Sequence, residues 1–216
     1  MDATKPQRAL IIAGGNPIKP AVTEHFGDFD FVVAADSGLD EAFRIGIAPD
    51  LVVGDMDSVG PDALQRAQGQ GIAIERHPVA KDATDLELAI DAATAAGYER
   101  ATIIGGTGGR MAHTLANALL LLKERSIALE WRTSRATITA IRTGGSHTYR
   151  RVDGALLSVL AVGGSAECES AGLRWPLSGR PFSPGSTRGV SNEIVADVAR
   201  VSVTGGQVLI VQERNQ

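Results

Sequence analysis

Four aspartates in the first half of the chain follow short apolar runs, or lie in the loops just after such runs. They are Asp36, Asp55, Asp57 and Asp85. Carboxylates that gather at strand ends repel one another unless a cation lies between them. Hard oxygen atoms are the ligands that Mg²⁺ prefers. The four side chains therefore predict a magnesium site for phosphate chemistry, in which all four aspartates are metal ligands.

Each of these aspartates also has a simpler interpretation. An aspartate after a strand commonly caps a helix or forms a turn, and Asp36 and Asp57 each precede a possible helix. The recurrence of the pattern at successive strand ends favours metal binding for the set. Asp82 fits either role. The residues alone do not assign a catalytic base among Asp55, Asp57 and Asp85.

A glycine-rich segment, Gly105-Gly106-Thr107-Gly108-Gly109-Arg110, ends an apolar run and opens a helical pattern. Gly108 and Gly109 would let a phosphate approach the backbone, where a helix N-terminus offers free N–H groups. Arg110 can bind two phosphate oxygens at once. The alternative is a tight turn that needs positive φ. The segment is neither a Walker A motif nor the dinucleotide fingerprint, and Gly14-Gly15-Asn16 is a weaker segment of the same kind.

Three further polar side chains lie near these segments. Lys81 stands just before Asp82 and Asp85, so it either offsets the charge of a transferred phosphate or is solvated surface. On the helix expected to start near Arg110, His113 and Asn117 share a face with Arg110. His113 either acts on phosphate as a donor or acid–base group, or serves only in packing.

The elements that must position these residues alternate between strands and helices up to about Arg132. Several strands are apolar throughout, as parallel strands buried on both faces are. This alternation predicts an open α/β sheet, whose ligands bind outside the carboxyl ends of the strands. We expect strands at residues 9–13, 31–35, 51–53, 72–75, 102–104 and 127–131.

Two helices have clear apolar stripes. Thr84 and Glu87 form a capping box at the start of the first, and Gly97 is expected to end it. The second starts near Arg110. Their expected buried stripes are Leu86, Ala89, Ile90 and Ala93 in the first helix, and Leu115, Ala118, Leu119 and Leu122 in the second.

After Arg132 the pattern changes to short strands separated by glycine-rich turns. We expect strands at residues 136–141, 147–152, 155–162, 167–170, 192–195 and 201–211, the last folded as a hairpin around Thr204-Gly205-Gly206-Gln207. This part predicts a second, all-β domain that is a sandwich or a partial barrel. The domains are therefore expected to be an α/β domain at 1–133 and an all-β domain at 134–216.

The all-β part contains three residues suited to an aromatic ligand. Only 4% of the chain is aromatic, so a tryptophan beside a proline is conspicuous. Trp175 offers a flat face for an aromatic or cationic ligand, or it fills a small β core. Ser191 and Asn192 either hydrogen-bond the edge of a heteroaromatic ring or form a turn.

Composition limits the partners and the compartment. The net charge of −4 argues against sequence-independent binding to nucleic acid or to an anionic membrane. The longest clean apolar run, residues 155–162, is too short to span a membrane. Cys168 is the only cysteine, so no intrachain disulfide can form, and we expect a cytoplasmic protein.

Taken together and in this order, the segments resemble thiamine pyrophosphokinase from about residue 9 to about residue 211. The resemblance implies an α/β catalytic domain that binds ATP and magnesium, a β-sandwich domain that binds thiamine, and a homodimer with active sites between the subunits. It is carried by residues 34–38, 46–50, 54–58, 81–85, 108–113 with Asn117, 172–177 and 191–193.

The resemblance also implies a reaction and the residues that serve it. The diphosphoryl group of ATP is transferred to the hydroxyl of thiamine, which gives thiamine diphosphate and AMP and requires Mg²⁺. The implied catalytic residues are Asp55, Asp57, Asp85, Lys81 and Arg110. The implied nucleotide-binding residues are Asp36, Gly108, Gly109, His113 and Asn117, and the implied thiamine-binding residues are Trp175, Ser191 and Asn192.

The chain departs from the family pattern at one position. The family typically reads Gly-Gly-Arg-x-Asp-His, and here Ala112 takes the place of the aspartate. A methyl group cannot accept a hydrogen bond, bind metal or act as a base. Ala112 therefore leaves open a catalytically impaired thiamine or nucleotide binder. The same aspartates also fit a diphosphokinase for another heteroaromatic alcohol, such as a hydroxymethyl pterin, and a metal-dependent phosphohydrolase.

Overall fold

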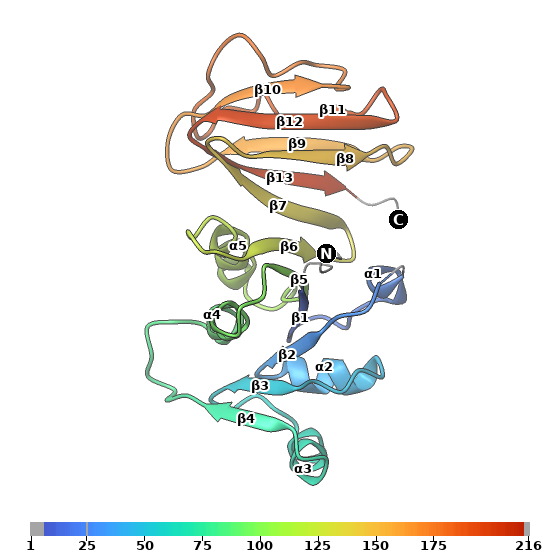
Figure 1. Cartoon of the computed structure of the whole chain (residues 1–216), viewed down its shortest axis with the longest axis vertical. Helices are drawn as coiled ribbons and strands as arrows, with labels where there is room; N and C mark the ends of the chain where they lie inside the picture. Colours follow the sequence, from blue (N-terminus) through green and yellow to red (C-terminus); the bar gives the residue numbers. More distant parts are fainter. Residues whose placement is uncertain (1–6, 25, 214–216) are drawn as a thin grey trace, which may run out of the picture. The chain divides into compact units, whose positions relative to one another are not determined.

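A computed structural model of the protein describes residues 7–24 and 26–213 (Figure 1). These residues fall into two compact units. The first runs to Leu120 and includes Glu124–Ser134, and the second comprises Leu121–Lys123 and the residues from Arg135 onward. Within the described ranges, none of the helices has the length and apolar character needed to cross a membrane.

The first unit is built on a parallel sheet with strand order β6-β5-β1-β2-β3-β4. The strands are Arg8–Ala13 (β1), Phe31–Ala35 (β2), Leu51–Gly54 (β3), Ala73–Arg76 (β4), Arg100–Gly105 (β5) and Ala128–Arg132 (β6). The helices are Pro20–Thr23 (α1), Gly38–Arg44 (α2), Pro61–Gly69 (α3), Asp85–Ala95 (α4) and Met111–Leu120 (α5). The prediction of an open, mostly parallel α/β sheet is confirmed, and each expected strand is present to within one or two residues at either end.

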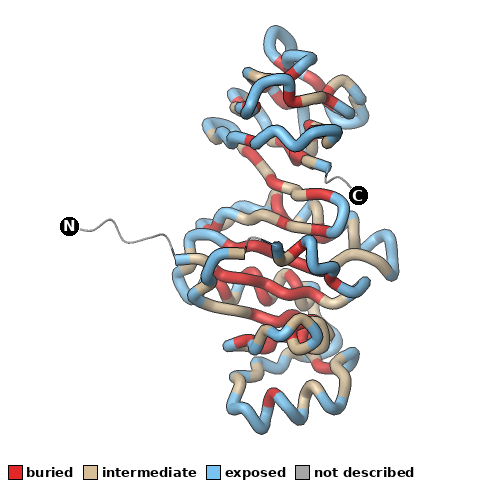
Figure 2. Tube along the Cα trace, turned by 90° about the vertical axis from the view of Figure 1, so that its right-hand side faces the viewer, coloured by how far each residue is buried: buried red, intermediate tan, exposed pale blue. Residues whose placement is uncertain are grey.

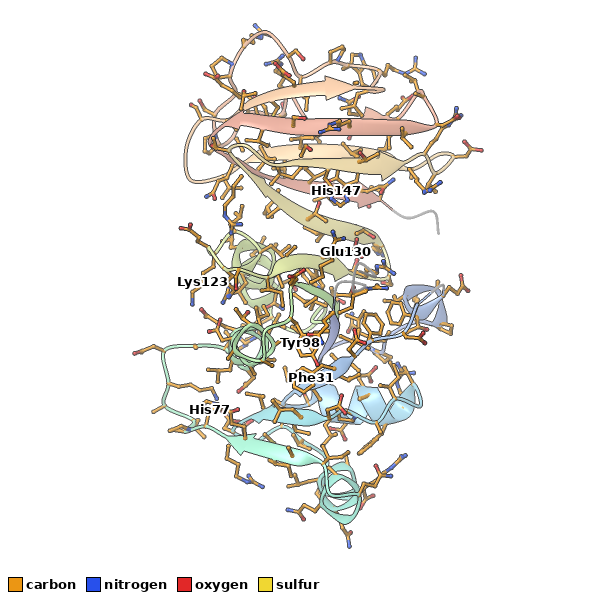
Figure 3. All side chains as sticks on the ribbon, in the orientation of Figure 1. Phe31, His77, Tyr98, Lys123, Glu130 and His147 are labelled. Carbon is orange, nitrogen blue, oxygen red and sulfur yellow. The ribbon has the colours of Figure 1, made fainter. Side chains whose placement is uncertain are left out.

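Apolar side chains on both faces of the sheet form the core of this unit. In β1, Leu10 and Ile12 point to one face, where they pack with Val22 of α1 and Ala42 of α2. The strands carry most of the buried positions, whereas the helices alternate between buried and exposed ones (Figure 2). At the start of β2, Phe31 stacks on Tyr98 with 5.1 Å between ring centroids (Figure 3).

Helix α4 forms as the capping box predicts. The Thr84 side chain accepts a hydrogen bond from the Glu87 backbone N–H at 3.2 Å. All four expected stripe residues are buried, and the helix contacts β1, β2 and β3. The chain leaves the helix through Gly97, whose φ of +86° is the left-handed conformation that favours glycine.

Helix α5 differs from its prediction. Leu115 and Leu119, expected to be buried, are 59% and 51% exposed, and Met111 is 71% exposed. Ala118 and Leu122 are only partly buried. The buried residue of the helix is the polar Asn117. The prediction of a buried stripe is therefore wrong: its leucines in α5 are exposed within the described residues, and Leu122 lies after the end of the helix.

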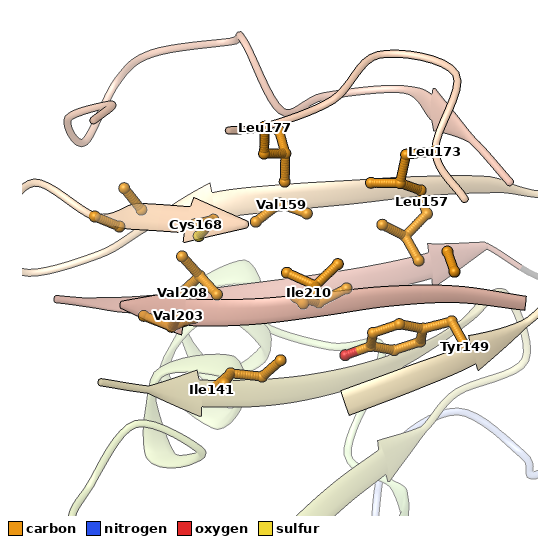
Figure 4. Close-up of a cluster of buried hydrophobic side chains, with 14 of the residues drawn as sticks. Ile141, Tyr149, Leu157, Val159, Cys168, Leu173, Leu177, Val203, Val208 and Ile210 are labelled. Atoms are coloured by element: carbon orange, nitrogen blue, oxygen red, sulfur yellow. The ribbon is translucent and has the colours of Figure 1, made fainter. Parts of the chain in front are cut away.

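The second unit is a β-sandwich. One layer has the strand order β11-β9-β13-β7 and the other β10-β12-β8, and all pairings are antiparallel. Buried side chains from both layers, among them Leu157, Val203 and Ile210, fill the space between them (Figure 4). The strands are Ala136–Arg142 (β7), Ser146–Arg150 (β8), Leu156–Ala161 (β9), Glu167–Ala171 (β10), Asn192–Glu193 (β11), Val198–Gly205 (β12) and Gln207–Glu213 (β13).

The hairpin expected at residues 201–211 is wrong. β12 and β13 are consecutive, but β12 pairs with β8 and β10 whereas β13 pairs with β7 and β9. Gly206, at φ +73°, turns the chain from one layer of the sandwich to the other. A Cβ atom there would lie 2.3 Å from the Ser165 carbonyl oxygen. The glycine pair therefore marks a corner between the two layers.

Candidate functional site

The carboxyl ends of five parallel strands meet at one edge of the first unit's sheet. Register places Ala13 of β1 opposite both Ala35 of β2 and Gly105 of β5, and β3 and β4 end together at Gly54 and Arg76. The strand order reverses between β1 and β5. Open α/β sheets bind ligands outside the carboxyl ends of their strands, at such a reversal point.

Three of the four predicted aspartates come together at this edge. Ligand oxygens of Asp36, Asp55 and Asp57 all lie within 4.8 Å of one another. Asp36 directly follows β2, and the other two follow β3. Asp55 also accepts a hydrogen bond from the Asp57 backbone N–H at 3.1 Å, which fixes the turn between them.

Lys81 links the fourth aspartate to this group. Its Nζ lies 2.7 Å from Asp55 Oδ2 and 2.9 Å from Asp85 Oδ1. Both Lys81 and Asp55 are largely buried, with side chains 13% and 10% exposed. Asp85 is the first residue of α4. Lys81 is therefore part of the acidic cluster and is not solvated surface.

The charged groups of the cluster shift one another's pKa values. Burial, together with the charges of Asp85, Asp55 and Asp57, raises the pKa of Asp36 despite a backbone hydrogen bond at Ser37 that lowers it. The hydrogen bond from Lys81 lowers the pKa of Asp55. Burial alone would lower the pKa of Lys81, but its contacts with Asp55 and Asp85 outweigh that effect and raise it. The site is thus a concentrated negative charge that one lysine offsets in part.

The cluster fits a divalent cation. Asp36 is 8% exposed, and its Oδ1 atom is buried with no hydrogen-bond partner among the described residues. A buried carboxylate oxygen in that state needs a cation or a proton to be satisfied. The donor set consists of carboxylate oxygens, the ligands that Mg²⁺ prefers. Asp36, Asp55 and Asp57 could therefore hold such an ion together.

The glycine-rich loop after β5 packs against the loop after β1. The Asn16 backbone N–H donates to the Thr107 carbonyl at 2.7 Å. A Cβ atom at Gly108, where φ is +88°, would lie 2.2 Å from Asn16 Oδ1. At Gly14 a Cβ atom would lie 2.1 Å from the Ser37 hydroxyl oxygen, next to Asp36. The two glycine loops and the acidic cluster thus form one continuous stretch of the sheet edge.

Two buried side chains hold the glycine-rich loop from behind. Asn117 Nδ2 donates to the Gly106 carbonyl and Trp131 Nε1 donates to the Gly105 carbonyl, both at 2.9 Å. Arg110 and His113 are exposed at the start of α5 and make no side-chain hydrogen bond or ion pair with any described residue. The predicted face therefore divides into two exposed residues that can meet a ligand and one that supports the loop.

Strained backbone coincides with the predicted motifs. Among the described residues, Asp36, Met56 and Ser191 are the non-glycine residues with positive φ, at +48°, +67° and +56°. Such conformations cost about 1–3 kcal/mol each and cluster at functional sites. Two of them place the carboxylates of the acidic cluster, and the third lies in the predicted thiamine segment.

The predicted thiamine residues lie together in the second unit. Trp175 is 52% exposed, so it does not fill the sandwich core. Asn192 Oδ1 accepts a hydrogen bond from the Trp175 backbone N–H, and Asn192 Nδ2 donates one to the Trp175 carbonyl. Ser191 is exposed, and its backbone N–H donates to the Ser158 hydroxyl oxygen at 3.1 Å. The two sequence segments that carry these residues therefore meet in space.

Comparison with known proteins agrees with this arrangement. Residues 22–130 match the model of the thiamin pyrophosphokinase catalytic domain, and residues 147–208 match that of the thiamin pyrophosphokinase vitamin B1 binding domain. The chain belongs to the thiamin pyrophosphokinase family. It is accordingly an enzyme of this type.

Individual thiamine pyrophosphokinases are similar to this chain over nearly its whole length. The Bacillus subtilis thiamine pyrophosphokinase is 26% identical over 206 residues, which cover 94% of this chain and 96% of that protein. Its crystal structure superposes with a TM-score of 0.86 over 97% of this chain and 100% of that one. The Geobacillus thermodenitrificans enzyme, 25% identical, gives a TM-score of 0.83 over 97% of this chain and 99% of its own.

Some residues of the site escaped the sequence-based analysis. Trp131 was assigned only to a strand, and the contact of Asn16 with Gly108 was not foreseen. Asn16 had a signal, because it follows two glycines at the end of the first strand. Trp131 had none, because its indole N–H reaches a carbonyl 26 residues away in sequence.

His77, bonded to Glu75 at 2.8 Å, lies in the loop after β4 (Figure 3).

Proposed function

We propose that the protein transfers the diphosphoryl group of ATP to the hydroxyl group of thiamine, which yields thiamine diphosphate and AMP. One observation carries the proposal: the carboxylates of Asp36, Asp55 and Asp57 converge within 4.8 Å beside a glycine-rich loop. The same chain continues into a region that matches a vitamin B1 binding domain. A simple phosphohydrolase would need the carboxylates but no such region.

The reaction defines what the residues must do. The thiamine oxygen bonds to the β-phosphorus of ATP, the bond from that phosphorus to the bridging oxygen of AMP breaks, and the hydroxyl proton leaves. Catalysis of this kind depends on positioning and on charge stabilisation. Lys81 and Arg110 offset the charge on the phosphoryl oxygens. The N–H groups of Gly108 and Gly109, with His113, bind the phosphates, and Asn117 supports their loop.

The acidic cluster is assigned to magnesium in this proposal. Bound Mg²⁺ neutralises phosphate oxygens and orients them. Asp36, Asp55 and Asp57 would hold the ion, and Asp85 is the fourth ligand of the set. The unpartnered Asp36 oxygen supports this assignment. Because Lys81 contacts both Asp55 and Asp85, it would lie beside phosphates bound to an ion that these carboxylates hold.

Thiamine is assigned to the second unit. Its thiazolium ring is a cation, and a tryptophan face attracts cations. Trp175 offers such a face because about half of its surface is open to solvent. Ser191 is exposed, and its hydroxyl group is assigned to hydrogen-bond the polar edge of the ligand. Asn192 is assigned to the same pocket.

The proposal extends to assembly, domains and compartment. The exposed stripe of Met111, Leu115 and Leu119 on α5 supports a homodimer, because apolar surface of this kind commonly marks an interface. Residues 1–133 and 134–216 are proposed as the ATP-binding and thiamine-binding domains. A single buried cysteine supports a reducing, cytoplasmic location.

A coupled product assay tests the proposed reaction. Purified protein is incubated with ATP and Mg²⁺, with or without thiamine, and AMP and thiamine diphosphate are measured by mass spectrometry. We expect equal amounts of the two products, and no AMP without thiamine or with a chelator. A hydroxymethyl pterin tested in parallel would reveal a different acceptor. Phosphate release without any alcohol would contradict the proposal in favour of hydrolysis.

Ala112 supports a second candidate function, the binding of thiamine or a nucleotide without turnover. Ala112 is exposed at the start of α5, two residues after Arg110. If the chain is only a thiamine or nucleotide binder, both ligands bind but no AMP forms. The variant Ala112→Asp then restores AMP release. If the natural chain turns over, Ala112→Asp changes kcat little, and the aspartate is dispensable in this protein.

A further inference from the structure

Asn192 is almost completely enclosed, which is unusual for a residue expected to meet a ligand. It is 1% exposed. Its Oδ1 atom accepts hydrogen bonds from the backbone N–H groups of Trp175 at 3.1 Å and Glu193 at 2.9 Å. Its Nδ2 atom donates to the Trp175 carbonyl at 2.6 Å. An asparagine amide has two acceptor sites and two N–H donors, so three of its four hydrogen-bonding positions are occupied by backbone.

The Asn192 amide completes a short antiparallel ladder. Residues 172–174 pair with residues 193–195: the Val195 N–H donates to the Gly172 carbonyl, and the Arg174 N–H donates to the Glu193 carbonyl, each at 2.9 Å. The next residue, Trp175, finds no backbone partner there and bonds instead to the Asn192 side chain. The preceding residue, Ser191, is in the left-handed conformation at φ +56°. The Asn192 side chain thus takes the place of a neighbouring strand's backbone as the hydrogen-bond partner of Trp175.

The Trp175 backbone is fixed from both sides. Its N–H and carbonyl groups are both held by Asn192, and the following Pro176 restricts it to extended conformations. Two residues on, the Leu177 N–H donates to the Ser170 hydroxyl oxygen at 2.9 Å, and the Leu177 side chain is buried. Trp175 as a whole nevertheless stays 52% exposed. The result is a rigid backbone that presents a half-exposed aromatic ring, whose centroid lies 5.8 Å from the guanidinium carbon of Arg174.

We infer that Asn192 is a positioning residue: it holds Trp175 in a preorganised conformation for a cationic aromatic ligand and does not itself contact that ligand. The inference rests on the proposed function, in which that ligand is thiamine. A ring held in advance loses little conformational freedom on binding, so preorganisation raises affinity without adding a contact. Asn192 therefore acts on thiamine affinity only through Trp175.

A double-mutant cycle tests this role. Asn192→Asp keeps the size and the Oδ1 acceptor, but it replaces the donor to the Trp175 carbonyl with a second carboxylate oxygen, which that carbonyl repels. We expect it to raise the KM for thiamine about tenfold, as the loss of one buried hydrogen bond would, and to leave the KM for ATP unchanged. In a Trp175→Ala background the same change should have almost no further effect. An equal loss in both backgrounds would overturn the inference in favour of direct contact.

A spectroscopic measurement tests the clamp without turnover. The chain has two tryptophans, and Trp131 is 1% exposed, so iodide quenches Trp175 selectively. The fluorescence anisotropy of the quenchable component should fall in Asn192→Asp because the ring becomes more mobile. Unchanged anisotropy would overturn the inference. If the natural chain showed no thiamine turnover, the proposed function would fail, and the anisotropy would still decide the role of Asn192.

A matched control separates positioning from general destabilisation. Thr143 lies in the same sandwich, and its side chain donates to the Gly206 carbonyl at 2.9 Å. Thr143→Val also removes one side-chain to backbone hydrogen bond, but at the other end of β9. Its partner Gly206 lies just before Val208, which pairs with Ala161, whereas Asn192 pairs with Leu157. We expect it to lower the melting temperature without changing thiamine KM or Trp175 anisotropy. An equal rise in thiamine KM in this control would overturn the positioning role.

Discussion

Asp57 and Asp36 belong to the same carboxylate group but differ in burial, so their substitution should have different consequences. Asp57 is exposed, whereas Asp36 is 8% exposed and has a buried, unpartnered oxygen. An exposed carboxylate contributes little to the free energy of folding, so its substitution mainly affects the binding of a ligand. A buried carboxylate among like charges is held in place by the fold against its own electrostatic cost.

Asp57→Asn should remove activity and leave the fold intact. We expect kcat to fall by at least about a hundredfold, as the loss of a charge-stabilising group does, and the free energy of unfolding to change by no more than about 0.5 kcal/mol. Steady-state kinetics and urea unfolding measure the two quantities. Asp28→Asn, an exposed aspartate outside the cluster, serves as the control and should change neither. Activity near that of the natural chain would remove Asp57 from the metal set.

Asp36→Asn should stabilise the protein at neutral pH in the presence of a chelator. Burial raises the pKa of Asp36 above its unfolded value, so its favourable contribution to folding is complete below about pH 4 and is lost as pH rises through the folded pKa. Asparagine carries no charge and tolerates positive φ. The gain in unfolding free energy should therefore grow from pH 4 to pH 7. A gain independent of pH, or a loss at pH 7, would contradict this account.

At the scale of elements, glycine lets β3 and β2 bring their carboxylates together. Gly54 ends β3 with φ at +151°. A Cβ atom there would lie 3.0 Å from Asp36 Cβ and 3.0 Å from Asp85 Oδ1. The close approach of the two strand ends thus requires a residue without a side chain at this position.

Gly54→Ala should therefore damage both stability and activity. We expect a loss of about 1–3 kcal/mol in unfolding free energy, from backbone strain and overpacking, together with a clear drop in kcat. Gly69→Ala is the matched control, because a Cβ atom at Gly69 in α3 would meet nothing within 4 Å. It should be neutral or slightly stabilising. Equal effects of the two substitutions in urea unfolding and kinetics would show that the contact at Gly54 does not matter.

Elements with a strong local signal were predictable from the sequence. The Thr84 capping box, the buried stripe of α4 and the strands before the aspartates all follow from short-range patterns. The convergence of the aspartates follows because the carboxyl ends of parallel strands lie at the same edge of a sheet, where ligands bind. What failed depends on distant partners. The pattern of α5 does not say what covers Leu115, and the glycine pair at the end of β12 does not say which layer receives β13.

The same reason explains the roles of the two asparagines. Asn117 bonds to a carbonyl 11 residues away, and Asn192 bonds to a backbone 17 residues away. Sequence assigned both to ligands because they lie in motifs that resemble the family. The structure gives their amide groups backbone partners. Binding of ATP by Asn117 stays a prediction, whereas for Asn192 we infer a positioning role without contact to thiamine.

At the scale of the whole molecule, the uncovered stripe of α5 bears on assembly. Leu115→Glu places a charge in the middle of the stripe formed by Met111, Leu115 and Leu119, and should shift a dimer towards monomer. Size-exclusion chromatography with light scattering gives the mass directly. Val152→Glu, at another exposed apolar residue, is the control and should leave the mass unchanged. A natural chain that is monomeric at all concentrations would contradict the proposed homodimer.

The most direct test of the central claim is whether the acidic cluster holds a divalent cation beside ATP. Mn²⁺ replaces Mg²⁺ and reports its ligands by electron paramagnetic resonance. We predict that the natural chain with ATP binds Mn²⁺ tightly, and that Asp57→Asn and Asp36→Asn each weaken this binding by at least about tenfold. Asp28→Asn should bind as the natural chain does. Unchanged Mn²⁺ binding and spectra in both cluster variants would contradict the account, because Asp36 and Asp57 would then not be metal ligands.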